Sequence, residues 1–482
     1  MLNQLLNSPL IRKTYQISQK HHQDIFLVGG TLRDLYLNAS MKNDFDFLVK
    51  NNVKSIASDF SKLCKGSFFC LDKKRDYYRV VIKDRDENYS IDFSPILNGN
   101  IHSDLISRDF SINSIALRLT DIFEKGSLTP IDPTGGLKDF GERVIRLSSP
   151  TAISHDPVRI LRAVRFARKF NFTIESHTVN LIKENIRNLL KCPWERIRSE
   201  FFKILSLPHA SKSLRELDQL GVLSLMIPEI ENMKGVNQGT KHDYELWEHS
   251  LKTVHFAETV LLTIKDYFPK HGEFLENYFR QELESDIKRT TLLTFIALLH
   301  DIGKPSTRSI KNKQVHFYQH DRIGAKINQG IAHRFKMGKK TTHIITTATH
   351  YHLRLLSHHH SDNLTQRAKY RFFRDLDDAS FDTLILSCAD KMATRKHSTE
   401  NTNHLPILYL VNELIDYYFQ EYSKSTPKPL LNGNEIMEIL TLKPGEKIGE
   451  LIALIEEAER DGRITTRDEA VKIISSEIKK HN

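Results

Sequence analysis

Apolar residues in the first third of the chain occur in short runs that are separated by polar turns. Four runs have the length and the β-branched or aromatic content of strands: residues 25–28, 45–49, 77–82 and 89–93. Segments with helical spacing lie between them. Residues up to about 145 are therefore predicted to form an α/β region.

The pattern changes at Asp156. Beyond it, Pro and Gly become less frequent, and apolar residues recur at spacings of three and four, as at positions 160, 161, 164 and 167. This is the period of an amphipathic helix. The remainder of the chain is predicted to be almost wholly helical.

The composition is that of a globular protein. Of 482 residues, 39% are hydrophobic and 27% are charged, which excludes the disordered and collagen-like classes. The richest apolar stretch, residues 292–299, is shorter than the ~18 residues of a membrane span, and the N-terminal residues lack the order of a secretory signal. We expect a cytoplasmic protein with no membrane partner, whose four sparse cysteines are reduced thiols.

Positive charge is concentrated in one segment. The formal net charge of the chain is +10, and residues 143–215 alone contain 15 Lys or Arg against 5 Asp or Glu, a surplus of 10. Such a concentration is the electrostatic signature of a surface that meets phosphates. A solvated helical face is the alternative that composition leaves open.

Histidine usage sets another segment apart. Of the 23 histidines, 14 lie between His242 and His360, which suggests a separate metal-centred domain. The run at 358–360 is expected in a solvated loop. Residues 423–429 are predicted to be a linker, and Thr466 with Glu469 three residues later predicts a helical capping box.

Two features of the first fifty residues suggest phosphoryl chemistry. Gly29 and Gly30 lie where a strand turns into a helix, so backbone N–H groups can approach a phosphate, with Arg33 in the first helical turn. Asp44 and Asp46 share one face of a strand because side chains alternate. Two carboxylates beside a phosphate cradle are expected to bind Mg²⁺ for in-line phosphoryl chemistry.

Five motifs follow one another over the first 205 or so residues: Gly29-Gly-Thr-Leu-Arg-Asp34, Asp44-Phe-Asp46, Arg108-Asp-Phe-Ser-Ile-Asn113, Asp132-Pro-Thr-Gly-Gly136 and Asp156-Pro-Val-Arg-Ile-Leu-Arg-Ala-Val-Arg-Phe166. In order and spacing they resemble the class II tRNA nucleotidyltransferase and bacterial poly(A) polymerase family. The resemblance implies that Asp44 and Asp46 hold Mg²⁺, with Asp92 as a candidate third catalytic carboxylate. It implies nucleotide binding by Gly29, Gly30, Arg33, Arg108, Asp109, Asn113, Asp156, Arg159, Arg162 and Arg165.

Base selection is expected from one helix. Asp156 and Arg159 are neighbours on its surface with Arg162 at their border, whereas the three-residue spacing carries Arg165 toward another face. A carboxylate that accepts from an exocyclic amino group and a guanidinium that donates to a ring nitrogen fit cytosine and adenine, and they reject uracil and guanine. The alternative for Asp156, which precedes Pro157, is an ordinary helix N-cap.

A second set of motifs lies in the histidine-rich part: residues 246–249, 298–304, 319–325, 348–350 and 388–391. In order they resemble the HD phosphohydrolase superfamily. The resemblance implies one metal on His249, His300, Asp301 and Asp390, and a second on His320 and His350. A divalent transition metal (Ni²⁺, Mn²⁺, Fe²⁺ or Co²⁺) is expected there, and it would activate water against a phosphoester.

Together these interpretations predict an α+β protein with four parts. An α/β nucleotidyltransferase head spans residues 1–145, a basic helical neck and body spans 146–235, a helical HD domain spans 236–422, and a helical C-terminal segment spans 430–482. The turns of the last segment resemble the C-terminal region of tRNA nucleotidyltransferases. They are expected to contact tRNA or, alternatively, only to join packing helices.

The leading functional hypothesis is template-independent addition of CMP and AMP, or of AMP alone, from CTP and ATP to the 3′ end of tRNA, with release of pyrophosphate. Poly(A) polymerase is the alternative within the same class. A phosphohydrolase acting on 2′,3′-cyclic or terminal phosphates is the alternative from another class. A catalytically silent RNA-binding protein is disfavoured by the intact pair Asp44 and Asp46.

Overall fold

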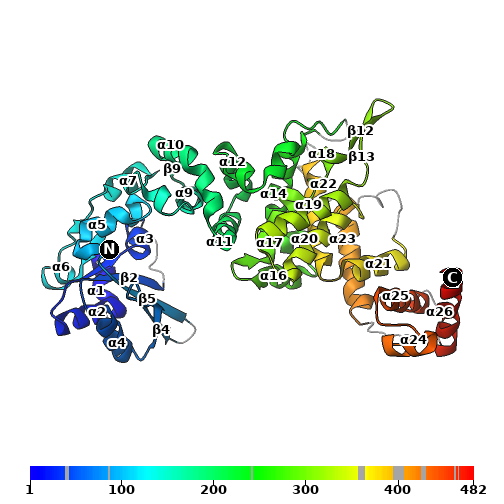
Figure 1. The fold of residues 1–482 in the computed structure, drawn as a ribbon, viewed down its shortest axis with the longest axis horizontal. Helices are drawn as coiled ribbons and strands as arrows, with labels where there is room; N and C mark the ends of the chain where they lie inside the picture. The colour runs from blue at the N-terminus through cyan, green and yellow to red at the C-terminus, as the bar shows by residue number, and fades with distance from the viewer. Residues whose placement is uncertain are drawn as a thin grey trace. The chain divides into compact units, whose positions relative to one another are not determined.

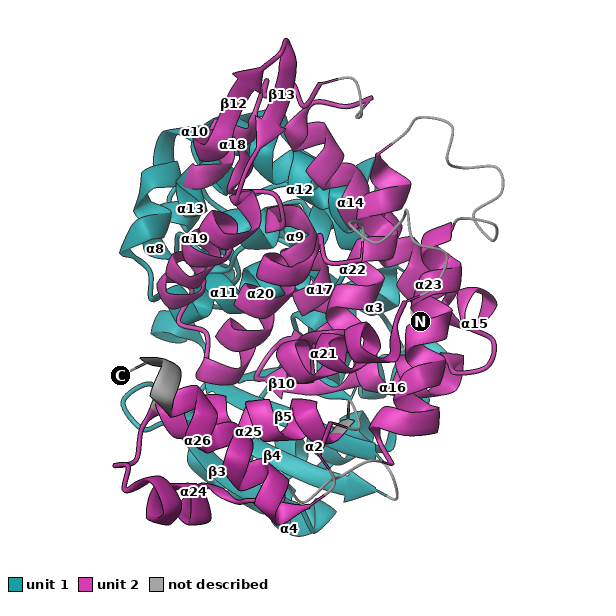
Figure 2. Ribbon diagram, turned by 90° about the vertical axis from the view of Figure 1, so that its right-hand side faces the viewer, with its two compact units in different colours: residues 1–228 teal, residues 229–482 magenta. Residues whose placement is uncertain are grey.

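The fold is described from a computed structural model. It describes residues 1–37, 43–84, 87–239, 243–355, 364–394, 406–424, 430–460, 463–464 and 466–481. The histidine run at 358–360 and linker residues 425–429 lie outside this set. The chain divides into two compact units, residues 1–228 and 229–482 (Figure 2). No helix in the described part of the chain is long and apolar enough to cross a membrane.

A seven-stranded sheet organises the first part of unit 1 (Figure 1). Its strands, in the spatial order β3-β4-β5-β2-β1-β6-β7, are β3 (Ser67–Asp72), β4 (Tyr77–Asp84), β5 (Glu87–Pro95), β2 (Asp44–Val49), β1 (Ile25–Val28), β6 (Ala116–Arg118) and β7 (Pro130–Ile131). β2 pairs in parallel with β5 and antiparallel with β1. The end of β2 that carries the two aspartates therefore lies between two neighbouring strands.

Side-chain alternation gives the sheet two different faces. Phe45 and Phe47 of β2 are buried in the main core, whereas Asp44 and Asp46 are exposed and point the other way. The helices of this part are α1 (Leu2–Asn7), α2 (Pro9–Lys20), α3 (Gly30–Tyr36), α4 (Val53–Cys64), α5 (Ile101–Ser107), α6 (Leu119–Glu124) and α7 (Gly136–Glu142). α2 and α4 pack on the main core through Ile17, Ile56 and Phe60.

The rest of unit 1 is a helical neck. It comprises β8 (Val144–Ile145), α8 (Ala152–His155), α9 (Arg159–Phe170), β9 (Thr173–Ile174), α10 (Ser176–Asn185), α11 (Trp194–Leu205), α12 (Ala210–Gln219) and α13 (Val222–Met226). α9 buries one apolar face against α11 and α12, including Ile160, Val164 and Ala167, as its spacing predicts. Its arginines are left on the remaining surface.

Unit 2 begins as a bundle around two almost fully buried helices, α17 (Arg289–Leu299) and α22 (Ser380–Ala393). The surrounding elements are α14 (Leu246–Leu262), α15 (Ile264–Tyr267), α16 (Gly272–Arg280), β10 (Glu282–Glu284), β11 (Ile287–Lys288), α18 (Lys304–Thr307), β12 (Arg308–Lys311), β13 (Gln314–Phe317), α19 (His320–Arg334), α20 (Lys339–Tyr351), α21 (Gln366–Leu376) and α23 (Pro406–Tyr417). Helices that are apolar on all sides belong in the centre of such a bundle.

The C-terminal helices have a hydrophobic core of their own. They are α24 (Gly433–Leu440), α25 (Glu446–Arg460) and α26 (Arg467–His481), and Ile436, Leu451 and Ile474 are buried among them. The predicted capping box is confirmed, because the Glu469 N–H donates to Thr466 Oγ1 and the Thr466 N–H donates to the Glu469 carboxylate.

The structure confirms the predicted fold class and differs from the expected elements in two respects. All four predicted strands are present, but β3, β6 and β7 were not predicted, because β3 is largely exposed and lacks alternation while β6 and β7 are very short. The part after Asp156 is almost wholly helical, as predicted, but the short strand β9 and the hairpins β10–β11 and β12–β13 were not expected. These hairpins carry mixed polar and apolar residues that periodicity alone does not separate from loops.

Candidate nucleotide pocket and metal centre

A glycine turn brings the backbone against the carboxylates of β2. Gly29 has φ of +76°, and a Cβ on it would lie 2.6 Å from Asp46 Oδ2, so only glycine fits at this position. The Thr31 hydroxyl donates to the backbone carbonyl of Asp44 at 2.7 Å, which ties the start of α3 to β2. The phosphate cradle and the two carboxylates are thus held together by local structure.

The two carboxylates of β2 lie beside a third on the next strand. Asp46 is directly opposite Asp92 in the parallel pairing of β2 and β5. The pKa of Asp46 is raised, chiefly because the surrounding protein reduces its hydration, and Asp92 and Asp44 add to this while Arg108 opposes it. A divalent cation would satisfy this concentration of negative charge. Asp92 is already bound by Arg79 through two hydrogen bonds of 2.7 Å.

A buried polar network supports one wall of the site. Asp109 Oδ1 accepts from the Asn113 amide and the Phe110 N–H at 2.9 Å, and its Oδ2 accepts from Arg162. Burial acts to raise the pKa of Asp109, but Arg162 and these hydrogen bonds outweigh it, so the pKa is lowered. Arg33 donates to Asn113 Oδ1 at 3.0 Å and extends the network to α3.

Arg33 is therefore held chiefly by protein groups. It is buried, donates to Asp34 at 2.8 Å, and lies over the rings of Phe166 and Phe170. Its guanidinium joins α3 to α9. The positive charge still faces the pocket, but its main observed role is to hold two elements together.

Arg159 and Arg165 on α9 have different protein partners. Arg159 uses three of its five N–H donors on the backbone carbonyls of Ser107, Arg108 and Ala152. Arg165 donates to Glu200 at 2.7 Å and lies over the ring of Phe166. The three-residue spacing was expected to carry Arg165 toward another face, but Arg165 lines the same cavity as Arg159.

Asp156 combines features of a helix cap with a place at the pocket. Its backbone is extended, its carbonyl accepts from the Arg159 N–H, and its Oδ1 accepts from the Val158 N–H at 3.4 Å, although α9 itself begins at Arg159. Asp156 Oδ2 accepts from Arg196 at 2.8 Å. The carboxylate also lines the pocket, so the two interpretations of this residue are compatible.

These residues line a single cavity of about 510 Å³, a volume typical of a small-molecule site. It collects nearly all of the residues predicted for the nucleotide site: Gly29, Gly30, Arg33, Asp44, Asp46, Arg108, Asp109, Asn113, Asp156, Arg159, Arg162 and Arg165. Asp92 does not line it. Thr31, Asp34, Phe166 and Lys169 complete the lining and were not predicted.

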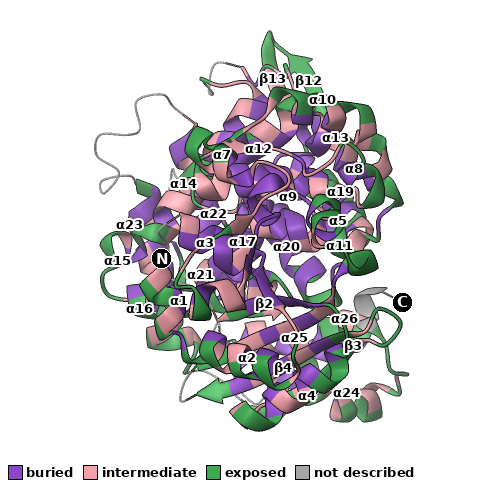
Figure 3. Cartoon of the chain, turned by 90° about the vertical axis from the view of Figure 1, so that its left-hand side faces the viewer, coloured by how far each residue is buried: buried purple, intermediate pink, exposed green. Residues whose placement is uncertain are grey.

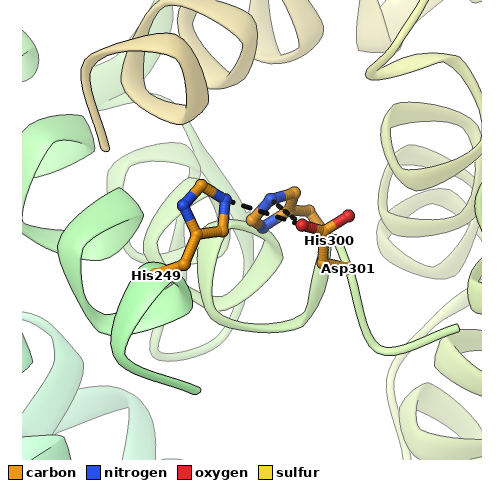
Figure 4. Close-up of side chains that lie close together, drawn as sticks. All are labelled: His249, His300 and Asp301. Atoms are coloured by element: carbon orange, nitrogen blue, oxygen red, sulfur yellow. Dashed lines mark ion pairs between the residues drawn. The ribbon is translucent and has the colours of Figure 1, made fainter. Parts of the chain in front are cut away.

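A second polar site lies inside the bundle of unit 2, and six separate positions converge on it. The residues are His249 on α14, His300 and Asp301 just after α17, His320 at the start of α19, His352 just after α20, and Asp390 on α22. All are buried. Figure 4 shows that the rings of His249 and His300 face the Asp301 carboxylate.

Asp301 lies between two pairs of histidines. Its Oδ2 is 3.2 Å from Nε2 of His300 and 3.5 Å from Nε2 of His249, and its Oδ1 is 3.2 Å from His320 and 3.5 Å from His352. Two triads fit metal coordination, one on each oxygen. Ligands about 2.1 Å from one cation are about 3.0–3.4 Å apart, so these separations are those of a coordination sphere.

The tautomers also favour metal binding. Nδ1 of His300, His320 and His352 lies within 2.9 Å of the backbone carbonyl oxygen three residues earlier in each case. A carbonyl oxygen only accepts, so the proton is on Nδ1 and Nε2 can offer its lone pair to the cluster. Nε2 of these rings and both oxygens of Asp301 make no hydrogen bond of good geometry.

The electrostatics of the cluster demand a cation. Burial lowers the pKa of His300, but Asp301 and Asp390 outweigh it and raise that pKa to about 10. Asp390 lies 3.0 Å from His249, next to the first triad. A divalent metal would supply the positive charge that a proton supplies otherwise. The side chains present therefore fit metal ions.

Comparison with known proteins matches the two sites to two families. Residues 25–146 match the poly A polymerase head domain, and residues 246–394 match the HD domain. Residues 171–234, in the neck, match a segment described as the probable RNA and SrmB binding site of polymerase A.

Curated relatives match along almost the whole chain. The A-adding tRNA nucleotidyltransferase of Deinococcus radiodurans is 31% identical over 92% of this chain and 93% of its own length. The chain belongs to the tRNA nucleotidyltransferase family. A CC-adding tRNA nucleotidyltransferase of Thermus thermophilus is 28% identical over 93% of the chain and 92% of its own length.

Solved structures share the fold of this tRNA nucleotidyltransferase family member. A CCA-adding enzyme in complex with CTP superposes with a TM-score of 0.61, at 19% identity, over 99% of this chain and 97% of the other. The Thermotoga maritima CCA-adding enzyme complexed with tRNA has a TM-score of 0.59, at 21% identity, over 99% and 98%.

The structure places one expected ligand outside the cluster. His350 is partly exposed and lies 3.7 Å from Asp321, outside the cluster, whereas His352 is fully buried and faces Asp301. Helical spacing indicated this, because the buried positions 341, 345, 348 and 352 share one face of α20.

Lys304 was also not predicted as part of this site. Its ammonium is 2.6 Å from Asp301 Oδ2 and donates to Gln238 at 2.7 Å. It lies on the short helix α18, between the cluster and the hairpin β12–β13. The cluster therefore has a cation of its own at its edge.

Proposed function

We propose that this protein adds CMP and AMP, or AMP alone, from CTP and ATP to the 3′ end of tRNA in the cytoplasm and releases pyrophosphate. One observation carries the proposal: the glycine turn, the carboxylates Asp44 and Asp46, and the pair Asp156 and Arg159 line one cavity. The names of the relatives agree with it, since they include A-adding and CC-adding tRNA nucleotidyltransferases.

Asp44 and Asp46 are the residues that would hold Mg²⁺. When bound, this ion assists ionisation of the attacking 3′ hydroxyl and neutralises charge on the departing pyrophosphate. The glycine turn offers backbone N–H groups to the triphosphate, and Arg108 supplies positive charge next to it. These groups position the α-phosphate for in-line attack.

Asp156 and Arg159 are proposed to select the base. Three N–H groups of Arg159 are used to fix its position, which leaves two for a ring nitrogen. Asp156 keeps acceptor capacity beside its bond with Arg196. Because the protein backbone orients Arg159, the pair reads cytosine or adenine without a template.

The decisive experiment uses three tRNA substrates, which end before the CCA, after one C, and after CC. Each is incubated with each of the four nucleoside triphosphates. Incorporation of C or A only, stopping at the natural end, supports the proposal. Long A tails on any RNA would replace it by poly(A) polymerase activity, and no incorporation would refute it.

We propose a second activity for unit 2, because Asp301 and five other buried side chains that can bind a metal lie together in two groups. His249, His300, Asp301 and Asp390 would hold one divalent transition metal, and His320 and His352 with the other Asp301 oxygen would hold a second. Bound metals supply Lewis acidity for hydrolysis of 2′,3′-cyclic or terminal phosphates. The test is hydrolysis of a 2′,3′-cyclic nucleotide by wild type and by His300→Ala, and equal rates would refute it.

A further inference from the structure

The hairpin β12–β13 projects from the helices of unit 2 (Figure 1). β12 is exposed along its whole length, and exposed residues predominate at this end of the unit (Figure 3). Its two-residue turn is Asn312 and Lys313, both with positive φ, which matches the twist of a tight hairpin. The hairpin is thus a short, well-formed arm.

The surface of the arm has the character of a polyanion-binding element. Residues 302–320 contain four Lys or Arg and no Asp or Glu. Among the described residues, no carboxylate lies within ion-pair distance of Arg308, Lys311 or Lys313. These cationic side chains can therefore bind the phosphate groups of a ligand.

The arm also presents apolar and aromatic groups to solvent. Tyr318 is 62% exposed, and its ring stacks on that of His316 with centroids 5.2 Å apart and planes 7° apart. Ile310 is 65% exposed. A flat, preformed pair of rings beside cations is the combination on which unpaired bases stack.

The base of the arm contacts the metal-ligand cluster itself. His320 Nδ1 donates to the Phe317 carbonyl, and the Phe317 ring lies 5.5 Å from the Lys304 ammonium. Lys304 in turn contacts Asp301. Gly303 brings the two ends of the arm together, because a Cβ there would collide with the His320 carbonyl at 2.1 Å. A long ligand bound along the arm could therefore reach the histidine and aspartate cluster with one end.

We propose that the hairpin β12–β13 is a binding arm for single-stranded RNA, which delivers a terminal phosphate of that RNA to the metal centre. The bases stack on Tyr318 and His316, while Arg308, Lys311 and Lys313 contact the chain phosphates. This proposal rests on the phosphohydrolase function proposed for unit 2. It adds the class of substrate, an RNA end rather than a free nucleotide.

The test compares the full-length protein with an arm variant, Tyr318→Ala with Lys311→Ser and Lys313→Ser. A matched control carries Tyr409→Ala, Lys424→Ser and Lys443→Ser, three exposed residues of unit 2 away from the arm in sequence. The probes are a ten-nucleotide uridine RNA ending in a 2′,3′-cyclic phosphate and the small diester bis(p-nitrophenyl) phosphate. Metal content shows whether the cluster of each variant has folded.

We expect the ratio of kcat/KM for the RNA to that for the small diester to fall about tenfold in the arm variant and to stay at the wild-type value in the control. Loss of two phosphate contacts should reduce the slope of log KM against log salt by about 1.4 for the RNA. A photoreactive uridine near the RNA end should crosslink to residues 308–318. An unchanged ratio together with no crosslink in this segment would overturn the proposal.

The experiment distinguishes an error in the phosphohydrolase proposal for unit 2 from an error in the RNA-binding proposal for the hairpin. If wild type hydrolyses neither probe, the phosphohydrolase proposal fails, and the crosslink alone decides: its presence in wild type and loss in the arm variant support the arm. Competition of the crosslink by polyglutamate as effectively as by unlabelled RNA would overturn the assignment to nucleic acid, because it would show that charge alone is recognised.

Discussion

The two sites of this protein differ in how their charged side chains are paired and how far they are exposed. In the head, the arginines around the pocket are already bonded to protein groups, as Arg162 is to Asp109 and Arg165 is to Glu200, while Asp44 and Asp46 remain exposed. In unit 2, all ligands are buried, and four histidines surround one carboxylate. The head carboxylates are accessible to a ligand from solvent, whereas the candidate metal-binding groups of unit 2 are enclosed by protein.

This difference follows from where the residues lie in the fold. The head carboxylates lie at the exposed start of β2, where a substrate can reach them from solvent. The cluster residues come from ends and turns of helices that pack around α17, so protein rather than solvent surrounds them. A metal in unit 2 should therefore contribute to folding, and Mg²⁺ in the head should not.

The largest effect is expected at the head carboxylates. Asp44→Ala and Asp46→Ala should each lower nucleotide incorporation at least about 10³-fold, because a lost metal site removes several kcal/mol of transition-state stabilisation. tRNA binding should stay close to wild type, because the phosphate contacts are expected from the basic neck rather than from these carboxylates. Primer extension and filter binding measure the two quantities, with the exposed Asp84→Ala as control. Extension by the Asp44/Asp46 double variant at the wild-type rate would exclude this catalytic role.

Metal content tests the enclosed site. His352→Ala should lose about one bound metal per chain and lower the melting temperature, because Nε2 of His352 faces Asp301. His350→Ala is the matched control two residues away and should keep its metal. Elemental analysis of both purified variants measures this. Nucleotide addition should be unchanged in both variants. If His352→Ala keeps its metal and His350→Ala loses it, the second group of ligands is misassigned.

The network under the head pocket should contribute to stability. Asp109→Asn should reduce the free energy of unfolding of unit 1 by about 2 kcal/mol, since it leaves Arg162 without its charged partner. The folded-state pKa of Asp109 is lowered, so its contribution is present above the unfolded value of about 3.9 and is lost as pH falls through the folded value. Denaturant titrations should give a constant difference from pH 5 to 8. A difference that grows on acidification would contradict this.

Nucleotide selection gives a finer test of the head. Asp156→Ala should reduce discrimination against UTP and GTP by about tenfold to a hundredfold, the value of one buried hydrogen bond. Arg196→Ala removes only the ion pair with Asp156, so it should keep discrimination and lose less than about 1 kcal/mol of stability. Steady-state kinetics with the four nucleotides separate the two variants. Unaltered selection in Asp156→Ala would assign this residue to structure alone.

The smallest effect is expected at the C-terminal helices. Because α24 to α26 have their own core, deletion of residues 430–482 should leave the rest folded. Extension of tRNA should weaken about tenfold more than extension of an unstructured oligonucleotide if this segment contacts a rigid tRNA arm. Primer extension on both substrates measures this. An equal loss on both would make the segment structural.

The local sequence pattern was sufficient to predict the site where the functional residues lie on one regular strand or turn. The alternation in Asp44-Phe-Asp46 placed both carboxylates on one face, and the glycine turn placed the cradle next to them. The sequence failed where a tertiary contact decides. Asp156 has the pattern of an N-cap but bonds to Arg196 on another helix, and Arg33 is held by Asn113 and two rings. The local sequence pattern does not indicate partners that lie far away along the chain.

The same limit explains the cluster. Motif order identified five of its six residues, but the choice between His350 and His352 depends on which face of α20 is buried. That face follows from periodicity over the whole helix rather than from the motif. Lys304 lies inside the motif at 298–304, three residues after Asp301, but the motif did not indicate that its ammonium contacts the Asp301 carboxylate.

The central claim is that one chain carries an open, exchangeable Mg²⁺ site and a closed, retained metal site. Brief dialysis of the full-length protein against a chelator, followed by elemental analysis and tRNA extension on the same sample, tests it most directly. We predict that extension disappears and returns on addition of Mg²⁺ alone, while transition metal stays bound at a level comparable with the chain. Loss of the buried metal as fast as loss of extension, or extension that Mg²⁺ alone fails to restore, would contradict the account.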